Sequence, residues 1–194
     1  MQEVAVPILS GWQNFFMLIG TAAATLMGLM FVSFTLVAGF ERDLSTLDAG
    51  VSAFNTPTVM LFVVVLLVAL ILNAPWQALS SLSLCLSLVA LAMLVYLSGV
   101  IRRLRHVPGY ATPLRDWLWY GAFPLSAHIV LFAGALILPG NPATALSIIS
   151  AAIVALLFIG VRNTWDLVTF LAIMRPRSVS PQNEAPHPED RREE

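Results

Sequence analysis

Charged residues are scarce in this chain: they make up 11% of its 194 residues, against about 25% in an ordinary soluble domain. Hydrophobic residues make up 58%, and the mean hydropathy is +0.84. So few charges cannot cover a folded core of this size with a polar surface, and the chain therefore needs an apolar solvent. The sequence predicts an integral membrane protein. Its length allows four to six spans of about 20 residues and no separate soluble domain.

Cysteine occurs once and lysine is absent. The single cysteine, Cys85, lies in an apolar run, so the chain can form no internal disulfide and has no cysteine-based metal motif. The sequence also lacks a G-x-S-x-G elbow and a phosphate-binding loop. We therefore assign no catalytic and no metal-binding residue, and we expect no cofactor and no nucleic-acid partner.

Long apolar runs, separated by turns and charged clusters, divide the chain into spans. They predict five transmembrane helices, at about residues 12–40, 57–73, 77–101, 117–138 and 143–163. The first run is too long for the apolar core of a removable signal peptide, and its leader carries Glu3 and no basic residue, so we expect it to stay as a span. The last helix meets no breaker before Pro176 and should extend to about residue 174. Residues 1–176 thus form one all-α transmembrane domain.

Residues 41–56 and 177–194 lie outside these spans. In the first segment, apolar residues recur at helical spacing, which predicts a short helix lying in the membrane interface. These residues are Leu44, Leu47, Val51 and Phe54. The second segment is rich in proline and charge and has almost no large apolar residue, so we expect a disordered tail.

The distribution of arginine predicts the orientation. With five spans, residues 41–56, residues 102–116 and the carboxyl-terminal segment share one side of the membrane, and that side carries all ten basic residues. Basic loops lie on the cytoplasmic side. We therefore expect the amino terminus outside and the carboxyl terminus in the cytoplasm. Four arginines near the third loop either serve topology alone or contact anionic lipid head groups: Arg102, Arg103, Arg105 and Arg115.

The first span carries a local pattern: W-x-x-F-F from Trp12 to Phe16, then A-A-x-L-x-G-L-x-F-V from Ala23 to Val32. With Asn163 and Trp165 in the last span, it resembles a group of small, uncharacterised bacterial multi-pass membrane proteins of about this length. The layout is similar along most of the chain, while the specific residues cover only these two segments. The resemblance implies a location in a bacterial cytoplasmic membrane and no particular activity.

Small side chains form a narrow face on the first span, because Gly20, Ala24 and Gly28 sit at i, i+4 and i+8. In lipid, such faces let helix backbones approach closely. The face serves either packing within one bundle or the seam of a complex, so a second copy or another membrane protein is a candidate partner. Two further small faces predict close packing or a polar path: one carries Ser80, Ser83, Ser87 and Ala90, and the other Ser147, Ala151 and Ala155.

His128 is the one ionisable residue near the middle of a predicted span. Ionisable groups at membrane depth are candidates for function, yet one hydrogen bond can satisfy a neutral histidine. No carboxylate and no second histidine share its depth, which excludes a metal set or a bis-histidine haem within one chain. Pro124, one turn earlier, should free the carbonyl of Tyr120. We expect His128 to be neutral and bonded to a hydroxyl at its own depth, of which there are three: Thr25, Ser87 and Ser150.

Arg162, Asn163 and Asp166 form a second polar group. Arg162 and Asp166 are one helical turn apart and can pair. Arg162 lies roughly 28 Å of helix from Ala143, which places it at the inner boundary of the bilayer. The apolar residues that follow should then pack on the 41–56 helix or dip into the head groups. Alternatively, the pair is buried at membrane depth and marks a functional site.

Three functions compete on these grounds. The favoured one is a non-enzymatic bundle that binds or modulates another membrane component, with the lipid bilayer itself and anionic lipid among its partners. The second is a small oligomeric channel or transporter that uses an intramembrane polar path around His128. The third, an intramembrane enzyme, is the least favoured, because no set of catalytic residues is recognisable.

Overall fold

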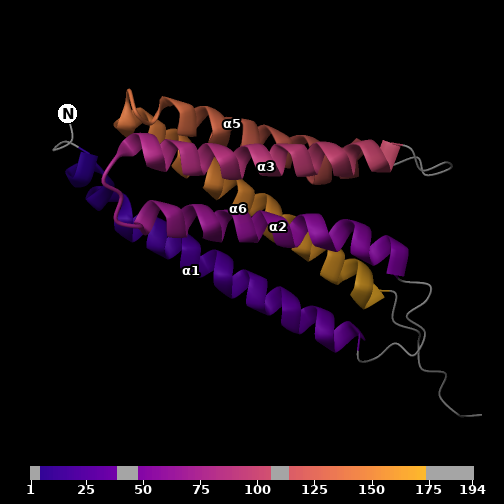
Figure 1. The fold of residues 1–194 in the computed structure, drawn as a ribbon. Helices are drawn as coiled ribbons and strands as arrows, with labels where there is room; N and C mark the ends of the chain where they lie inside the picture. The colour runs from indigo at the N-terminus through magenta and orange to yellow at the C-terminus, as the bar shows by residue number, and fades with distance from the viewer. Residues whose placement is uncertain (1–4, 39–47, 106–113, 174–194) are drawn as a thin grey trace, which may run out of the picture.

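The computed structural model describes residues 5–38, 48–105 and 114–173, and every regular element within those ranges is a helix (Figure 1). The prediction of an all-α fold is therefore confirmed for the described part. The helices are α1 (Ala5–Ala38), α2 (Asp48–Asn73), α3 (Leu79–Arg105), α4 (Leu114–Trp117), the π-helix η1 (Leu118–Ala122), α5 (Phe123–Ile137) and α6 (Pro142–Ile173). Because α4, η1 and α5 follow one another without a gap, the described residues form five long helical rods.

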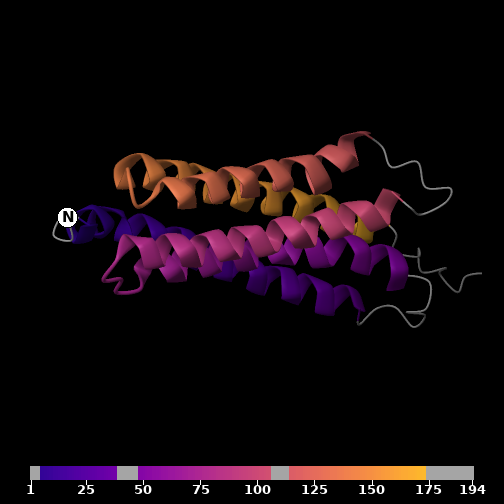
Figure 2. The same cartoon turned by 45° about the horizontal axis from the view of Figure 1, so that its top comes forward.

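Successive rods run in opposite directions along a common axis (Figures 1 and 2). The α1 and α2 helices form one pair, α3 and α5 form another, and α6 packs against α5, α2 and α1. A single large apolar core draws buried side chains from all five rods. Helix α6 is therefore the central element, and a site on it can contact both pairs.

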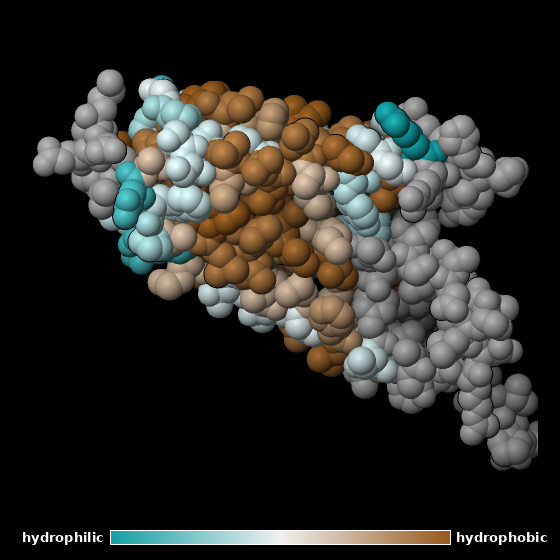
Figure 3. All heavy atoms as spheres, in the orientation of Figure 1, coloured by the Kyte–Doolittle hydropathy of each residue, from teal (hydrophilic) through white to brown (hydrophobic). Residues whose placement is uncertain are grey.

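Four helical segments are long and apolar enough to cross a membrane: Ile8–Ser33, Leu79–Arg102, Leu118–Ile137 and Pro142–Thr169. The apolar part of α2, Pro57–Asn73, is shorter. A broad band of apolar side chains covers the visible face of the bundle (Figure 3). Such a large apolar surface suits contact with lipid, because monomeric soluble proteins rarely expose a contiguous apolar patch beyond a few hundred Å².

The structure has one long helix, α2, where the sequence predicted a short interfacial helix within residues 41–56 followed by a separate span from residue 57. It begins at Asp48 and passes through Pro57 without a break, so residues 48–56 are the first part of a long helix. A proline removes one backbone hydrogen bond, but its fixed φ is compatible with a helix. Pro57 and Thr58 are both buried, so packing stabilises the continuous helix at this point. Residues 41–47 and the predicted tail at 177–194 lie outside the described residues.

Two glycines set the distance between α6 and its neighbours. A Cβ atom added at Gly134 of α5 would lie 2.9 Å from Cγ1 of Ile149, and one added at Gly160 of α6 would lie 2.8 Å from the ring of Phe62 in α2. Neither position accepts a larger side chain without movement. Glycine thus brings α6 into close contact with both helix pairs, in the manner expected of helices that pack in lipid.

Candidate functional site

A π-helical turn interrupts the rod that ends in α5. It spans Leu118–Ala122, and the backbone N–H of Phe123 donates to the carbonyl of Leu118. The cause follows directly in the sequence: Pro124 has no N–H, and its ring would crowd the carbonyl of Tyr120 in a regular α-helix. The wider turn relieves that crowding. Such π-turns occur frequently at functional sites, which directs attention to the side chains around this one.

Asn163 of α6 joins the π-turn through two reciprocal contacts. Its side-chain Nδ2 donates to the backbone carbonyl of Trp119 at 3.2 Å, and the hydroxyl of Tyr120 donates to the backbone carbonyl of Asn163 at 3.3 Å. Asn163 is 1% exposed, and its Oδ1 has no hydrogen-bond partner among the described residues. The two helices are therefore held together at this level by polar contacts rather than by apolar packing alone.

Arg162 and Asp166 form the ion pair that their spacing predicted, one turn apart on α6. The guanidinium of Arg162 also lies 4.4 Å from the centroid of the Trp119 ring, a cation–π contact. The side chains of Arg162 and Asp166 are 18% and 33% exposed, so neither is fully enclosed. We call Trp119, Tyr120, Arg162, Asn163 and Asp166 the polar cluster. It offers a charge pair held in a fixed position at the edge of the bundle.

The sequence predicts the three members of the polar cluster on α6. It singles out Tyr120 only for its backbone carbonyl, which Pro124 should free, and it assigns no role to the Tyr120 hydroxyl or to Trp119. Pro124 is also the signal for Trp119, because a proline inside a helix disturbs the preceding turn. That the disturbed turn faces Asn163 depends on how two distant segments pack, which the sequence pattern does not contain.

His128 is completely buried, and its hydrogen bond differs from the prediction. Its Nδ1 lies 2.7 Å from the backbone carbonyl of Pro124, one turn earlier on the same helix. A carbonyl only accepts, so Nδ1 carries the hydrogen in this contact. The predicted hydroxyl partner is wrong, because helical side chains lean toward the amino end of their own helix and meet that carbonyl first. The other ring nitrogen, Nε2, has no partner among the described residues.

None of the three hydroxyls predicted as partners forms a hydrogen bond with His128 among the described residues. Thr25 is exposed and donates to the carbonyl of Thr21 at 2.9 Å. Ser87 and Ser150 are buried, and the Oγ of each has no partner within the described residues. One turn before Ser87, Ser83 donates across from α3 to the carbonyl of Ala135 in α5 at 2.6 Å. Of this serine face, Ser83 therefore makes the interhelical hydrogen bond.

The small face on α1 divides between the core and the surface. A Cβ atom added at Gly20 would lie 2.9 Å from Cβ of Ala69 in α2, so Gly20 is a packing position within the bundle. Ala24 and Gly28 are exposed, and a Cβ added at Gly28 would meet nothing within 4 Å. Of the two glycines in this face, Gly20 packs closely against α2, and Gly28 has open space around it among the described residues.

The predicted lipid contacts lie at the end of the bundle where α3 and α6 end and α4 begins (Figure 1). Arg102 and Arg115 are exposed there. Arg103 and Arg105 belong to the last turn of α3, and their side chains are outside what is described. Within the described ranges, no group of three or more His, Cys, Asp or Glu side chains could hold a metal ion.

Comparison of the chain with models of protein families, with curated proteins and with solved structures gives no match. The resemblance seen in the first span therefore stays an expectation. The case for a function rests on the residues and their geometry.

Proposed function

We propose that this chain is a non-enzymatic, multi-pass protein of a bacterial cytoplasmic membrane that binds or modulates another membrane component through the polar cluster. The observation that carries the proposal is the partly exposed pair of Arg162 and Asp166, which is held on the ring of Trp119 beside a π-turn. Charges near hydrocarbon are costly and are characteristic of functional sites. A pair fixed in this way keeps its donors and acceptors in one geometry, ready for a polar group in the membrane interface.

In this proposal all five rods cross the bilayer, with the amino terminus outside and the carboxyl terminus inside. Helix α2 packs along α1 and α6, both of which contain segments long and apolar enough to cross. Its 26 residues give about 39 Å of helix, more than the hydrocarbon thickness of about 30 Å. The orientation follows from the ten arginines on one side.

A photoreactive residue placed at Trp117 tests the binding function. Trp117 is 39% exposed and lies about one helical turn before Tyr120, so its replacement reaches the surroundings of the polar cluster and leaves the cluster itself intact. We expect one defined membrane component to be captured in native membranes, and the Arg162→Gln variant to lose that adduct. Arg115→Gln removes an exposed arginine outside the cluster and should retain it. An adduct that survives Arg162→Gln contradicts the proposal.

A second candidate is a small oligomeric channel or transporter. It is favoured by three buried atoms that have no hydrogen-bond partner within the described ranges: Ser87 Oγ on α3, His128 Nε2 on α5 and Ser150 Oγ on α6. Buried polar atoms of this kind are often satisfied by internal water. Proton or solute flux into liposomes containing the purified chain, abolished by His128→Ala, would support this candidate over the first.

A further inference from the structure

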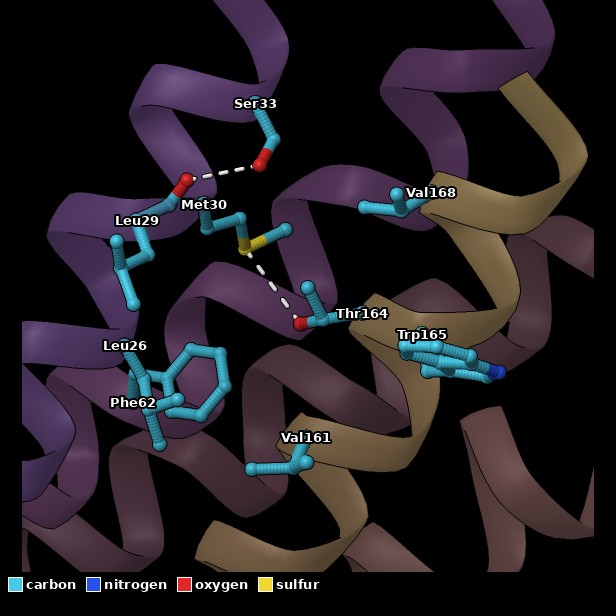
Figure 4. Close-up of a pocket in the computed structure, with 9 residues that line it drawn as sticks. All are labelled: Leu26, Leu29, Met30, Ser33, Phe62, Val161, Thr164, Trp165 and Val168. Carbon is cyan, nitrogen blue, oxygen red and sulfur yellow. Dashed lines mark hydrogen bonds between the residues drawn. The ribbon is translucent and has the colours of Figure 1, made fainter. Parts of the chain in front are cut away.

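A crevice lies on the outside of the bundle where α1, α2 and α6 meet (Figure 4). Its volume is about 170 Å³, and its walls come from four residues of α1, one of α2 and four of α6. Apart from Ser33 and Thr164, the lining residues are apolar or aromatic: Leu26, Leu29, Met30, Phe62, Val161, Trp165 and Val168. An apolar cavity of about 150 Å³ in another protein stays dry and binds a benzene-sized guest. This crevice is therefore large enough for part of a hydrocarbon chain.

The two hydroxyls in the crevice already have partners. Ser33 donates to the carbonyl of Leu29 at 2.9 Å, and Thr164 donates to the carbonyl of Gly160 at 2.8 Å (Figure 4 draws the first). Thr164 also lies 3.8 Å from the sulfur of Met30. Because both hydroxyls in the walls already have partners, the interior of the crevice favours an apolar guest over a polar solute.

The crevice opens outward between exposed apolar residues. Leu29 is 58% exposed, Val161 is 41% and Trp165 is 73%. These residues belong to segments of α1 and α6 that are long and apolar enough to cross a membrane. Around such segments the solvent is hydrocarbon, and wall atoms left without neighbours would lose their dispersion contacts. A lipid chain is the material available to restore them.

Trp165 gives the crevice a polar rim. In Figure 4 its ring nitrogen points away from Leu29 and Met30, and Nε1 donates to no group among the described residues. Trp165 lies three residues after Arg162, toward the arginine-bearing end of the bundle. Tryptophan is enriched at this level of membrane proteins because its ring suits hydrocarbon and its N–H suits the head-group region. Its free N–H can donate to the ester carbonyl or phosphate of a lipid.

We propose that this crevice is the seat of one acyl chain of a membrane phospholipid, with Trp165 at the rim that faces the lipid's polar part. The inference rests on the proposed function, since it takes the bound membrane component to be a lipid and requires α1 and α6 to cross the bilayer. The acyl chain would pack against the apolar walls of the crevice. The polar cluster lies on the adjoining face of α6.

Two substitutions that fill the crevice, each with a matched control, test the proposed acyl-chain site. Val161→Phe fills the crevice from α6, and Val154→Phe makes the same change at a position on α6 that is 44% exposed and outside the lining. Leu29→Phe fills it from α1, and Leu18→Phe is its control, since Leu18 is 69% exposed and also outside the lining. The second pair keeps the test decisive if one filling variant fails to fold.

The measurement uses the full chain in vesicles of phosphatidylcholine and phosphatidylglycerol with a trace of phospholipid carrying a diazirine in one acyl chain. After irradiation, we expect peptides covering residues 26–33 and 161–168 to carry several-fold more adduct than the exposed apolar face of α3 around Leu84 and Leu88. Each filling variant should lower that adduct several-fold, and each control should retain it. Equal labelling of all exposed apolar faces, or full labelling of both filling variants, contradicts the acyl-chain site and leaves the proposed function standing. Absence of labelling on every helix means that the chain does not lie in the bilayer and overturns the proposed function as well.

Discussion

The guanidinium of Arg162 lies 4.4 Å from the centroid of the Trp119 ring, which connects α6 to the π-turn of the neighbouring rod. The Asn163 side chain and the Tyr120 hydroxyl add hydrogen bonds between the same two helices at this level. Cation–π contacts contribute about 0.5–2 kcal/mol, with more where water is excluded. The cluster therefore combines a structural role with the fixed charge geometry that the proposed function uses.

Replacing Asn163 by alanine should destabilise the fold. The substitution leaves the carbonyl of Trp119 without its donor in a partly buried environment, at a cost of about 1–3 kcal/mol. Asn73→Ala is the matched control, because Asn73 is exposed and its Nδ2 donates to the carbonyl of Ala69 in its own helix at 2.8 Å. Thermal or chemical unfolding in lipid-like micelles measures both variants. Equal stability of the two variants contradicts the assigned role of Asn163.

Gly134 should not tolerate alanine, whereas Gly28 should. A methyl group at Gly134 meets Ile149 Cγ1 at 2.9 Å and the Ile149 backbone nitrogen at 3.4 Å, and overpacking of this kind costs about 1–3 kcal/mol. Gly28 has open space around it, and alanine is the better helix former by about 1 kcal/mol. The Gly28→Ala variant should therefore unfold at the wild-type temperature or above it. A Gly134→Ala variant as stable as wild type would refute the close approach of α5 and α6.

His128→Leu should cost less stability than Ser83→Ala. His128 bonds a carbonyl that the helix itself also satisfies, and the substitution removes from the core an Nε2 that has no partner in the described part of the chain, so we expect little loss of stability. Ser83→Ala removes a hydrogen bond between α3 and α5 and should cost about 1 kcal/mol. Unfolding measurements on the two single variants decide the matter. A His128→Leu variant that is far less stable than Ser83→Ala would show that Nε2 has a partner.

Reporter fusions test the topology. Fusions after residues 48, 108 and 185 should report the cytoplasm, and fusions near residues 75 and 140 should report the outside. The reason is that all ten basic residues then fall on one side. A cytoplasmic signal at residue 140 contradicts the arrangement with five spans.

Spacing along the chain predicted the ion pair on α6, and it did not predict the hydrogen bond of His128 or the course of α2. The pair of Arg162 and Asp166 was predictable because both residues lie on one helix and four residues always bring side chains together. The partner of His128 was not, because it depends on which acceptor the ring reaches first. The continuation of α2 through Pro57 was also missed, because a proline usually ends a helix and here buried packing against other helices prevails.

The small face on α1 shows the same limit. Gly20, Ala24 and Gly28 share one side of an ideal helix, yet Gly20 packs closely against α2 while Ala24 and Gly28 are exposed. Over eight residues, the direction in which α1 runs relative to α2 decides which positions remain in contact. Sequence spacing fixes which residues share a face and leaves open how far the neighbouring helix follows it.

The π-turn at Leu118–Ala122 has a consequence for the phase of the whole rod. In a helix one residue corresponds to roughly 100° of rotation, and a π-turn accommodates more residues than an α-helical turn. The rotation about the rod axis between residues before and after the π-turn therefore differs from that in a regular α-helix. A regular α-helix through the same residues would rotate one half of the rod against the other by about one residue, or roughly 100°. Either Trp119 and Tyr120 would then leave α6, or His128 would leave the core, so the π-turn lets one rod hold both contacts at once.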